Sequence, residues 1–82
     1  MILLRYRGDL QKLTGKDRDE IDAVTVADVL KFIRTSYGKD AYKRAAAMLI
    51  AVNGVSILLL NGKGTKLSDS DTVSFLPVCG GG

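Results

Sequence analysis

The sequence predicts an α+β fold in which one sheet is wrapped against one principal helix. The chain has 82 residues, too few to divide its apolar side chains between two independent cores. Its residues are 46% hydrophobic and 26% charged, with a single proline, which is typical of a folded domain rather than a disordered chain. Strand-like alternation near both ends of the chain flanks one strongly amphipathic helical segment, and such a helix needs a sheet or another helix to cover it.

The first strand is predicted over residues 2–6. Ile2, Leu4 and Tyr6 alternate with Leu3, Arg5 and Arg7, so a strand here buries the first set and turns the two arginines to solvent. Residues 8–15 hold two leucines between two glycines, which favours a short helical turn or a broad loop over a tight hairpin. A second strand is predicted over residues 19–24, where charges surround a few apolar residues as on an edge strand.

The principal helix is predicted to begin after Thr25. Thr25 and Asp28 have the spacing of a capping box, with Asp in place of the usual Glu or Gln, and Gly38 supplies a stop. Apolar residues at helical spacing form its core-facing stripe: Val26, Val29, Leu30, Ile33 and Tyr37. A second, shorter helix is predicted over residues 39–47, with Asp40 able to cap it.

The remaining strands lie in the last third of the chain. Residues 48–52 predict a central strand closed by the turn pair Asn53-Gly54, with a short hairpin partner over residues 56–60. Residues 61–64 predict a loop, and residues 66–71 form a polar stretch around the single anchor Leu67. The last strand covers residues 72–76, and Pro77 ends its ladder.

The composition excludes most catalytic chemistries within this chain. It has no histidine and one cysteine, Cys79, which excludes Cys–His and Ser–His–Asp catalysis, histidine metal sites and intramolecular disulfides. A net charge of +3 without interleaved aromatic residues argues against a nucleic-acid partner. A lone cysteine, no signal peptide and an interrupted apolar run over residues 48–60 predict a cytoplasmic protein without a membrane partner.

The C-terminal segment is the feature that carries chemistry. No charged side chain follows Asp71, and the chain ends in Gly80, Gly81 and Gly82. We therefore expect a folded domain over residues 1–76 and a flexible glycine tail over residues 77–82. Glycines without side chains can pass through a narrow channel and bring the terminal carboxylate to another protein's active site, although a frayed terminus has the same composition.

Several segments resemble the MoaD/ThiS family of sulfur carriers in order and spacing. They are Ile50-Ala51-Val52-Asn53-Gly54, Leu67-Ser68-Asp69-Ser70-Asp71-Thr72-Val73 and Phe75-Leu76-Pro77-Val78-Cys79-Gly80-Gly81. The resemblance covers the whole chain and implies a ubiquitin-like β-grasp fold. Two departures are a third glycine, Gly82, where the family stops at Gly-Gly, and Cys79 where the family has a small residue. We interpret Cys79 as a small apolar substitute and assign it no catalytic role.

The resemblance implies a carrier rather than an enzyme. A ubiquitin-activating-like adenylyltransferase would use ATP and Mg to adenylate the carboxylate of Gly82, or of Gly81 after trimming. A persulfide sulfur would then replace AMP, leaving a thiocarboxylate that donates its sulfur. No cofactor or metal would be bound by the chain itself.

The implied partners are the adenylyltransferase and a sulfur-accepting enzyme, in the first place the large subunit of molybdopterin synthase. The Leu-Pro-Val ending and the helix over residues 40–47 favour the molybdenum or tungsten cofactor pathway. The alternatives are a carrier for thiamin, cysteine or tRNA thiolation, a ubiquitin-like protein modifier, or a noncatalytic ubiquitin-like interaction domain. The surface expected to contact partners comprises Phe75, Leu76, Pro77, Val78 and Leu49. Leu58 or Leu60 is a further candidate for this surface.

Overall fold

The computed structural model describes residues 1–78. In chain order the elements are β1 (Ile2–Tyr6), α1 (Asp9–Thr14), β2 (Arg18–Ile21), α2 (Val26–Tyr37), α3 (Lys39–Ala47), β3 (Leu49–Val52), β4 (Val55–Ser56), η1 (Ile57–Leu59), η2 (Gly62–Gly64) and β5 (Thr72–Leu76). The two η elements are short 3₁₀ helices.

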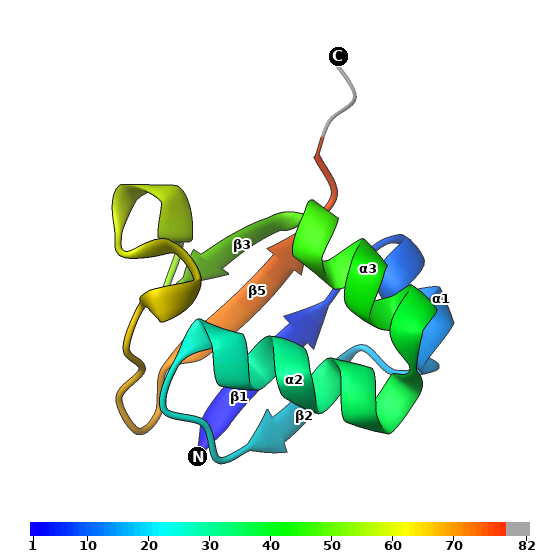
Figure 1. Ribbon diagram of the computed structural model, residues 1–82, viewed down its shortest axis with the longest axis horizontal. Coiled ribbons are helices and arrows are strands. Elements are labelled where there is room, and N and C mark those ends of the chain that lie inside the picture. Colours follow the sequence, from blue (N-terminus) through cyan, green and yellow to red (C-terminus); the bar gives the residue numbers. More distant parts are fainter. Residues whose placement is uncertain (79–82) are drawn as a thin grey trace.

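The strands form one mixed sheet in the order β2-β1-β5-β3-β4. β1 and β5 run parallel, and the three other pairings are antiparallel. Figure 1 shows α2 and α3 side by side across one face of this sheet. The α+β prediction of a sheet against one principal helix is therefore confirmed, with β5, the last strand, at the centre.

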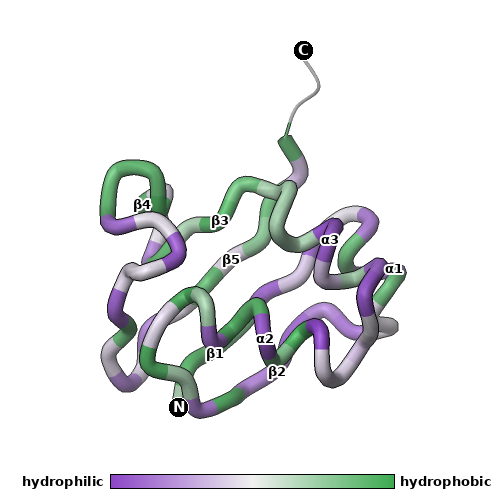
Figure 2. The backbone as a smooth tube through the Cα atoms, viewed as in Figure 1, coloured by the Kyte–Doolittle hydropathy of each residue, from purple (hydrophilic) through white to green (hydrophobic). Residues whose placement is uncertain are grey.

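The core lies between the sheet and α2. Alternate residues of the two central strands point inward, and Leu4, Val73 and Phe75 are fully buried. From α2, Val29 and Ile33 meet them and are also fully buried. In Figure 2 the inner strand β3 has hydrophobic colouring, whereas the edge strand β2 is mostly hydrophilic.

The principal helix begins and ends as its sequence predicts. The Thr25 hydroxyl accepts from the backbone N–H of Asp28, and the Asp28 carboxylate accepts from the N–H of Thr25, so the capping box is complete. Gly38 follows the last turn with φ +96°, a backbone conformation that side chains disfavour. The predicted cap of α3 is wrong, because Gly38 occupies that position without a side-chain bond and Asp40 lies within the first turn.

Two strand predictions need correction. The second strand ends at Ile21 instead of residue 24, because the Val24 carbonyl accepts from the Leu67 N–H and its own N–H donates to Asp28. The predicted strand over residues 56–60 is reduced to the two-residue β4. There the Ser56 hydroxyl accepts from the Leu58 N–H and turns the chain into η1.

Smaller differences concern single residues. β3 begins at Leu49, one residue later than predicted, because Met48 still closes α3 by donating to the Ala45 carbonyl. The predicted loop at residues 61–64 contains the single turn η2. None of the helices within residues 1–78 has the length and apolar character that crossing a membrane requires.

Candidate functional site

The candidate site is the end of the sheet from which the C-terminal segment leaves. β5 is held on both sides, by the parallel ladder to β1 and the antiparallel ladder to β3. Pro77 and Val78 continue beyond this end, on the side opposite the amino terminus (Figure 1). The segment that leads to the carboxyl terminus is therefore anchored on the central strand, where local opening is least favourable.

A close contact between Gly8 and Pro77 fixes the base of the segment. Gly8 has φ +59°, and a Cβ built on it would lie 3.0 Å from Cγ of Pro77. Its carbonyl also accepts from the N–H groups of Gln11 and Lys12 at the start of α1. Only glycine satisfies both the left-handed backbone and the close approach. From the sequence Gly8 is predicted only as a boundary of a helical turn or loop, because Pro77 lies at the far end of the chain.

A shallow hollow of about 270 Å³ lies beside this contact. Its walls come from the turn after β1, from the end of α3 and from the segment after β5, and include Asp9, Arg44 and Val78. Arg44 Nη2 lies 3.8 Å from the Asp9 carboxylate, which links α3 to the start of α1 across the hollow. This contact between exposed side chains orients the wall and contributes little stability.

The structure separates the predicted docking residues into two groups. Leu49 and Leu76 are directly opposite each other in the β3–β5 ladder, on the face of the sheet away from the helices. Leu49 is 38% exposed, Leu76 is half-buried, and Pro77 and Val78 are exposed. These four remain predicted contacts for a partner.

The prediction that Phe75 contacts a partner is wrong. Its exposed fraction is 0%, because the strand alternation places it with Val73 on the inner face. It packs 6.1 Å, centroid to centroid, from the ring of Tyr6, the residue beside it in β1. Its side chain therefore supports the central strand and is not available to a partner.

The terminus predicted to be functional, Gly80, Gly81 and Gly82, lies outside the described residues, as does Cys79. Within residues 1–78, no group of three or more histidine, cysteine, aspartate or glutamate side chains is arranged to hold a metal ion. The described part of the candidate site is the end of the central strand with the segment that follows it.

Shifted pKa values have structural causes elsewhere in the domain. The Ser68 N–H and then the Asn53 side chain lower the pKa of Asp71, and the N–H groups of Val24 and Thr25 lower the pKa of Asp28. Burial, followed by a hydrogen bond to Asp19, raises the pKa of the Tyr6 hydroxyl. These groups cap a helix or join strands, so their shifts do not indicate acid–base catalysis.

A second exposed apolar region lies beyond β4. Leu58 and Leu59 are 84% and 81% exposed, and Leu60 is also exposed. Figure 2 shows this loop in the hydrophobic colour. Leu58 and Leu60 are predicted from the sequence as surface residues, but Leu59 is not, because a strand would turn Leu59 inward whereas the 3₁₀ turn leaves it exposed.

Comparisons with known proteins place this arrangement among small carriers and modifiers. The sequence profile described as the ThiS family matches residues 4–82. The small archaeal modifier protein 1 (SAMP1) from Methanosarcina acetivorans superposes with a TM-score of 0.84 at 25% identity, covering 99% of this chain and 95% of that chain. No match is found among curated protein sequences.

Two further solved structures share the fold. CysO in the BexX/CysO complex of Amycolatopsis orientalis gives a TM-score of 0.84 at 18% identity, with 100% of each chain covered. A putative molybdopterin converting factor, subunit 1, from Pyrococcus furiosus gives 0.66 at 24% identity, covering 94% of this chain and 97% of that chain. The predicted ubiquitin-like β-grasp fold is therefore confirmed.

Proposed function

Because the chain belongs to the ThiS family of ubiquitin-like sulfur carriers and modifiers, we propose that it is a sulfur carrier whose C-terminal glycine becomes a thiocarboxylate. The observation that carries this proposal is the path of the chain. The central strand β5 ends at Leu76, and only Pro77, Val78 and Cys79 separate it from the three terminal glycines. No charged side chain accompanies the terminal carboxylate on this path.

The chemistry follows from the poor reactivity of a carboxylate. Its negative charge repels nucleophiles and it has no good leaving group, so it must first be activated. An adenylyltransferase with ATP and Mg joins the Gly82 carboxylate to AMP and releases pyrophosphate. A persulfide sulfur attacks the adenylate carbonyl carbon, AMP leaves, and the product is an acyl disulfide. A thiol then cleaves the S–S bond, is oxidised to a disulfide, and leaves the carrier as a thiocarboxylate.

The chain contributes presentation to these steps. The domain docks on an enzyme through the surface around Leu49 and Leu76, while the anchored β5 holds the start of the tail in a fixed direction. All of this takes place in the cytoplasm, where ATP is present. Trimming at Gly81 would move the reacting carboxylate by one residue without changing the anchor.

We assign the pathway to molybdopterin synthesis, with the large subunit of molybdopterin synthase as the sulfur acceptor. Two features support this assignment, the Leu76-Pro77-Val78 ending and the helix α3. Within the family, both favour the molybdopterin branch. A strain that lacks the gene should lose molybdenum- or tungsten-enzyme activity and should not regain it on addition of thiamin or cysteine. Rescue by either nutrient would assign the carrier to that pathway instead.

A second candidate function is protein modification. It is favoured by the 25% identity to SAMP1, a small archaeal modifier protein, over 99% of this chain. In that role the activated glycine carboxylate would form an isopeptide bond with a lysine of a target protein, releasing AMP or a thiol. Conjugates of higher mass in the host would distinguish this role from sulfur transfer.

The test of the carrier proposal is reconstitution with the host's adenylyltransferase, ATP and Mg. The full-length chain should gain the mass of an acyl-adenylate, whereas a chain lacking Gly81 and Gly82 should not. The truncated chain should keep the thermal midpoint of the full-length chain, because the deletion removes no side chain and leaves β5 complete. An adenylate on neither chain would contradict the proposal, and unchanged partner binding by the truncated chain would favour a noncatalytic interaction domain.

A further inference from the structure

A dense set of cations surrounds the end of the sheet that carries the C-terminal segment. They come from the end of β1, from α1 and from the start of β2. We call these exposed side chains the basic surface: Arg5, Arg7, Lys12, Lys16 and Arg18. They line two neighbouring hollows, of about 970 and 210 Å³. Five of the twelve Lys and Arg residues of the chain therefore share one region.

Few carboxylates balance this surface. Lys16 pairs with Asp19 at 3.2 Å, and Asp17 lines both hollows. Within residues 1–78, the ion pairs under 4 Å involve only the amino terminus, Lys16 and Arg44 as cations. The remaining guanidinium and ammonium groups of the basic surface thus have no carboxylate partner at that distance.

The strand register makes this arrangement unfavourable for the isolated domain. Arg5 and Arg18 are directly opposite each other in the antiparallel β1–β2 pair. Like charges in this position destabilise a sheet, and an acidic residue at either position would relieve the repulsion. An unfavourable pair of like charges that the fold does not require is typical of a functional surface.

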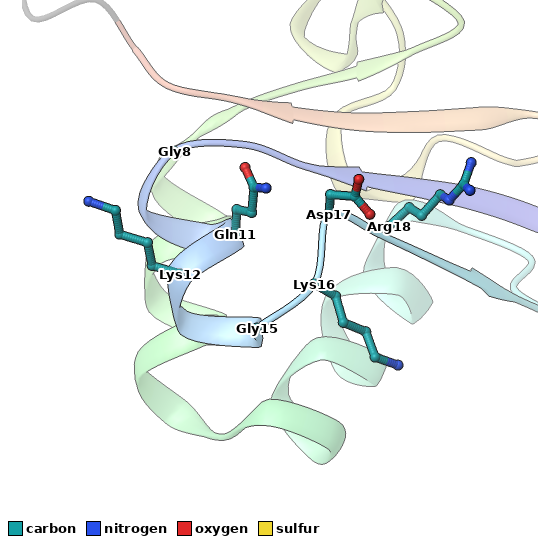
Figure 3. Close-up of a pocket in the computed structure, with 7 residues that line it drawn as sticks. All are labelled: Gly8, Gln11, Lys12, Gly15, Lys16, Asp17 and Arg18. Carbon is teal, nitrogen blue, oxygen red and sulfur yellow. The ribbon is translucent and has the colours of Figure 1, made fainter.

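The cations are arranged for a broad surface rather than for one small anion. Figure 3 shows the side chains of Lys12, Lys16 and Arg18 pointing in different directions around the larger hollow. A site for a single phosphate would instead have its donors converge on one point. The spacing fits several carboxylates spread over a protein surface.

Position connects this surface to the tail. Because β1 and β5 are parallel, their carboxyl ends lie at the same end of the sheet, and Gly8 contacts Pro77 there. An apolar strip adjoins the cations at this end and comprises Leu49, Leu76 and Val78. A protein that accepts the tail must approach this end of the sheet, and an apolar centre with a charged margin is the usual composition of such an interface.

The charges at the other end of the sheet have the opposite sign. Asp22, Asp28 and Asp69 line a hollow beside Met1, where β1 begins. The lining of that hollow carries three carboxylates and one cation, the amino terminus that pairs with Asp69, whereas cations predominate at the end where the tail leaves. Such a separation of charge orients an approaching acidic partner and accelerates its association.

The burial of the aromatic side chains favours a protein over RNA as the partner of the basic surface. The aromatic side chains within residues 1–78 are buried or half-buried, and none is exposed: Tyr6, Phe32, Tyr37, Tyr42 and Phe75. Single-stranded nucleic acid is usually bound on exposed rings on which bases stack. The basic surface has no exposed aromatic ring.

We infer that the basic surface docks on an acidic surface of the enzyme that activates the C-terminal carboxylate. The inference rests on the proposed function, because that function is the reason for an activating enzyme to take up the tail. The guanidinium groups of Arg5 and Arg18 form the outer part of this contact, and Leu49 and Leu76 form its apolar centre.

The test is calorimetric binding of the full chain to the host's adenylyltransferase without ATP, between about 50 and about 300 mM salt, where screening increases several-fold. The variant is Arg5→Gln/Arg18→Gln. The control is Lys31→Gln/Lys39→Gln, which removes the same charge from exposed positions on α2 and α3. We expect the variant to bind roughly tenfold more weakly at low salt and to depend less steeply on salt than wild type, with Arg7, Lys12 and Lys16 still in place. The control should bind within about twofold of wild type and keep its salt dependence.

Several outcomes would overturn the inference. They are equal weakening of variant and control, an affinity of wild type that does not change with salt, absence of binding, or tighter binding of a short single-stranded RNA than of the enzyme. Adenylate formation is measured separately by intact mass. Charge-dependent binding without adenylate formation would support the docking surface and contradict the proposed function. Adenylate formation with charge-independent binding would support the proposed function and contradict the docking surface.

Discussion

Asn53 and Asp71 are joined side chain to side chain, with Nδ2 of Asn53 donating to Oδ1 of Asp71 at 2.9 Å. Oδ1 of Asn53 accepts from the Thr72 N–H at 2.9 Å, and Oδ2 of Asp71 accepts from the Ser68 N–H at 2.8 Å. The turn after β3 is thereby tied to the entry of β5, the strand that leads to the tail. Both residues lie in segments that resemble the sulfur-carrier family, so the pair gives a physical reason for those segments.

Substitution of Asn53 should separate its two roles. Asn53 has φ +51°, so it supplies side-chain bonds and also tolerates a left-handed backbone. Asn53→Gly should lower the free energy of unfolding by about 1–2 kcal/mol through the lost hydrogen bonds. Asn53→Ala should lower it by about 1 kcal/mol more, because alanine also resists the backbone conformation. Urea denaturation measures both, and equal losses would show that backbone strain is unimportant.

Asp71 should contribute to loss of stability in acid. Its folded-state pKa is lowered, first by the Ser68 N–H and then by Asn53, so the stabilisation is present above the unfolded pKa of about 3.9. It is lost as the pH falls through the lower folded pKa. The urea midpoint of wild type should therefore fall in this range more steeply than that of Asp71→Asn. Parallel profiles for the two proteins would contradict the assignment.

Ser70→Gly should stabilise the domain. Ser70 has φ +73° and an exposed side chain, between the two aspartates of the turn before β5. Relief of the left-handed strain exceeds the added entropy of the unfolded chain, and we expect a gain of about 0.5 kcal/mol. The same change at Ser36, in α2, should instead lose about 0.5 kcal/mol. A loss at both positions in thermal denaturation would refute the explanation.

Gly8→Ala should disturb the base of the tail. Gly15 is a control for positive φ alone: its φ of +72° and ψ of 12° are left-handed helical, and nothing lies within 4 Å of its added Cβ. Gly15→Ala should lose about 1 kcal/mol. Gly8→Ala should lose more for two reasons, because its φ of +59° with ψ of −135° is a backbone conformation that side chains disfavour more strongly and because Pro77 must move. Only Gly8→Ala should also slow adenylation. Equal effects of the two substitutions on both measurements would show that the Gly8–Pro77 contact has no role.

Local signals in the sequence predict the central part of the fold. The capping box of Thr25 and Asp28, the stripe of α2 and the alternation of β5 each depend on neighbouring residues, and the structure confirms them. The error in β2 occurs where a distant residue decides, because the strand ends early when the Val24 carbonyl accepts from the Leu67 N–H. The error at the start of α3 is local, because Gly38 takes the cap position that was assigned to Asp40.

Predictions for the candidate site also succeed where neighbouring residues decide, and they miss contacts that distant residues decide. The alternation of β5 correctly predicts that Leu76 faces outward, and it also places Phe75 inside, so assigning the whole ending to a docking surface is wrong for Phe75. The Gly8–Pro77 contact joins opposite ends of the chain, and no local pattern indicates it. The opposition of Arg5 and Arg18 requires the strand register, which periodicity alone does not define.

The most direct test of the carrier function is the intact mass of the protein isolated from its own host without reductants or added thiols. The account predicts a species in which one oxygen of the terminal carboxylate is replaced by sulfur, and the same spectrum shows whether the chain ends at Gly82 or Gly81. A uniformly unmodified chain, isolated from cells that actively need the sulfur product, would contradict it.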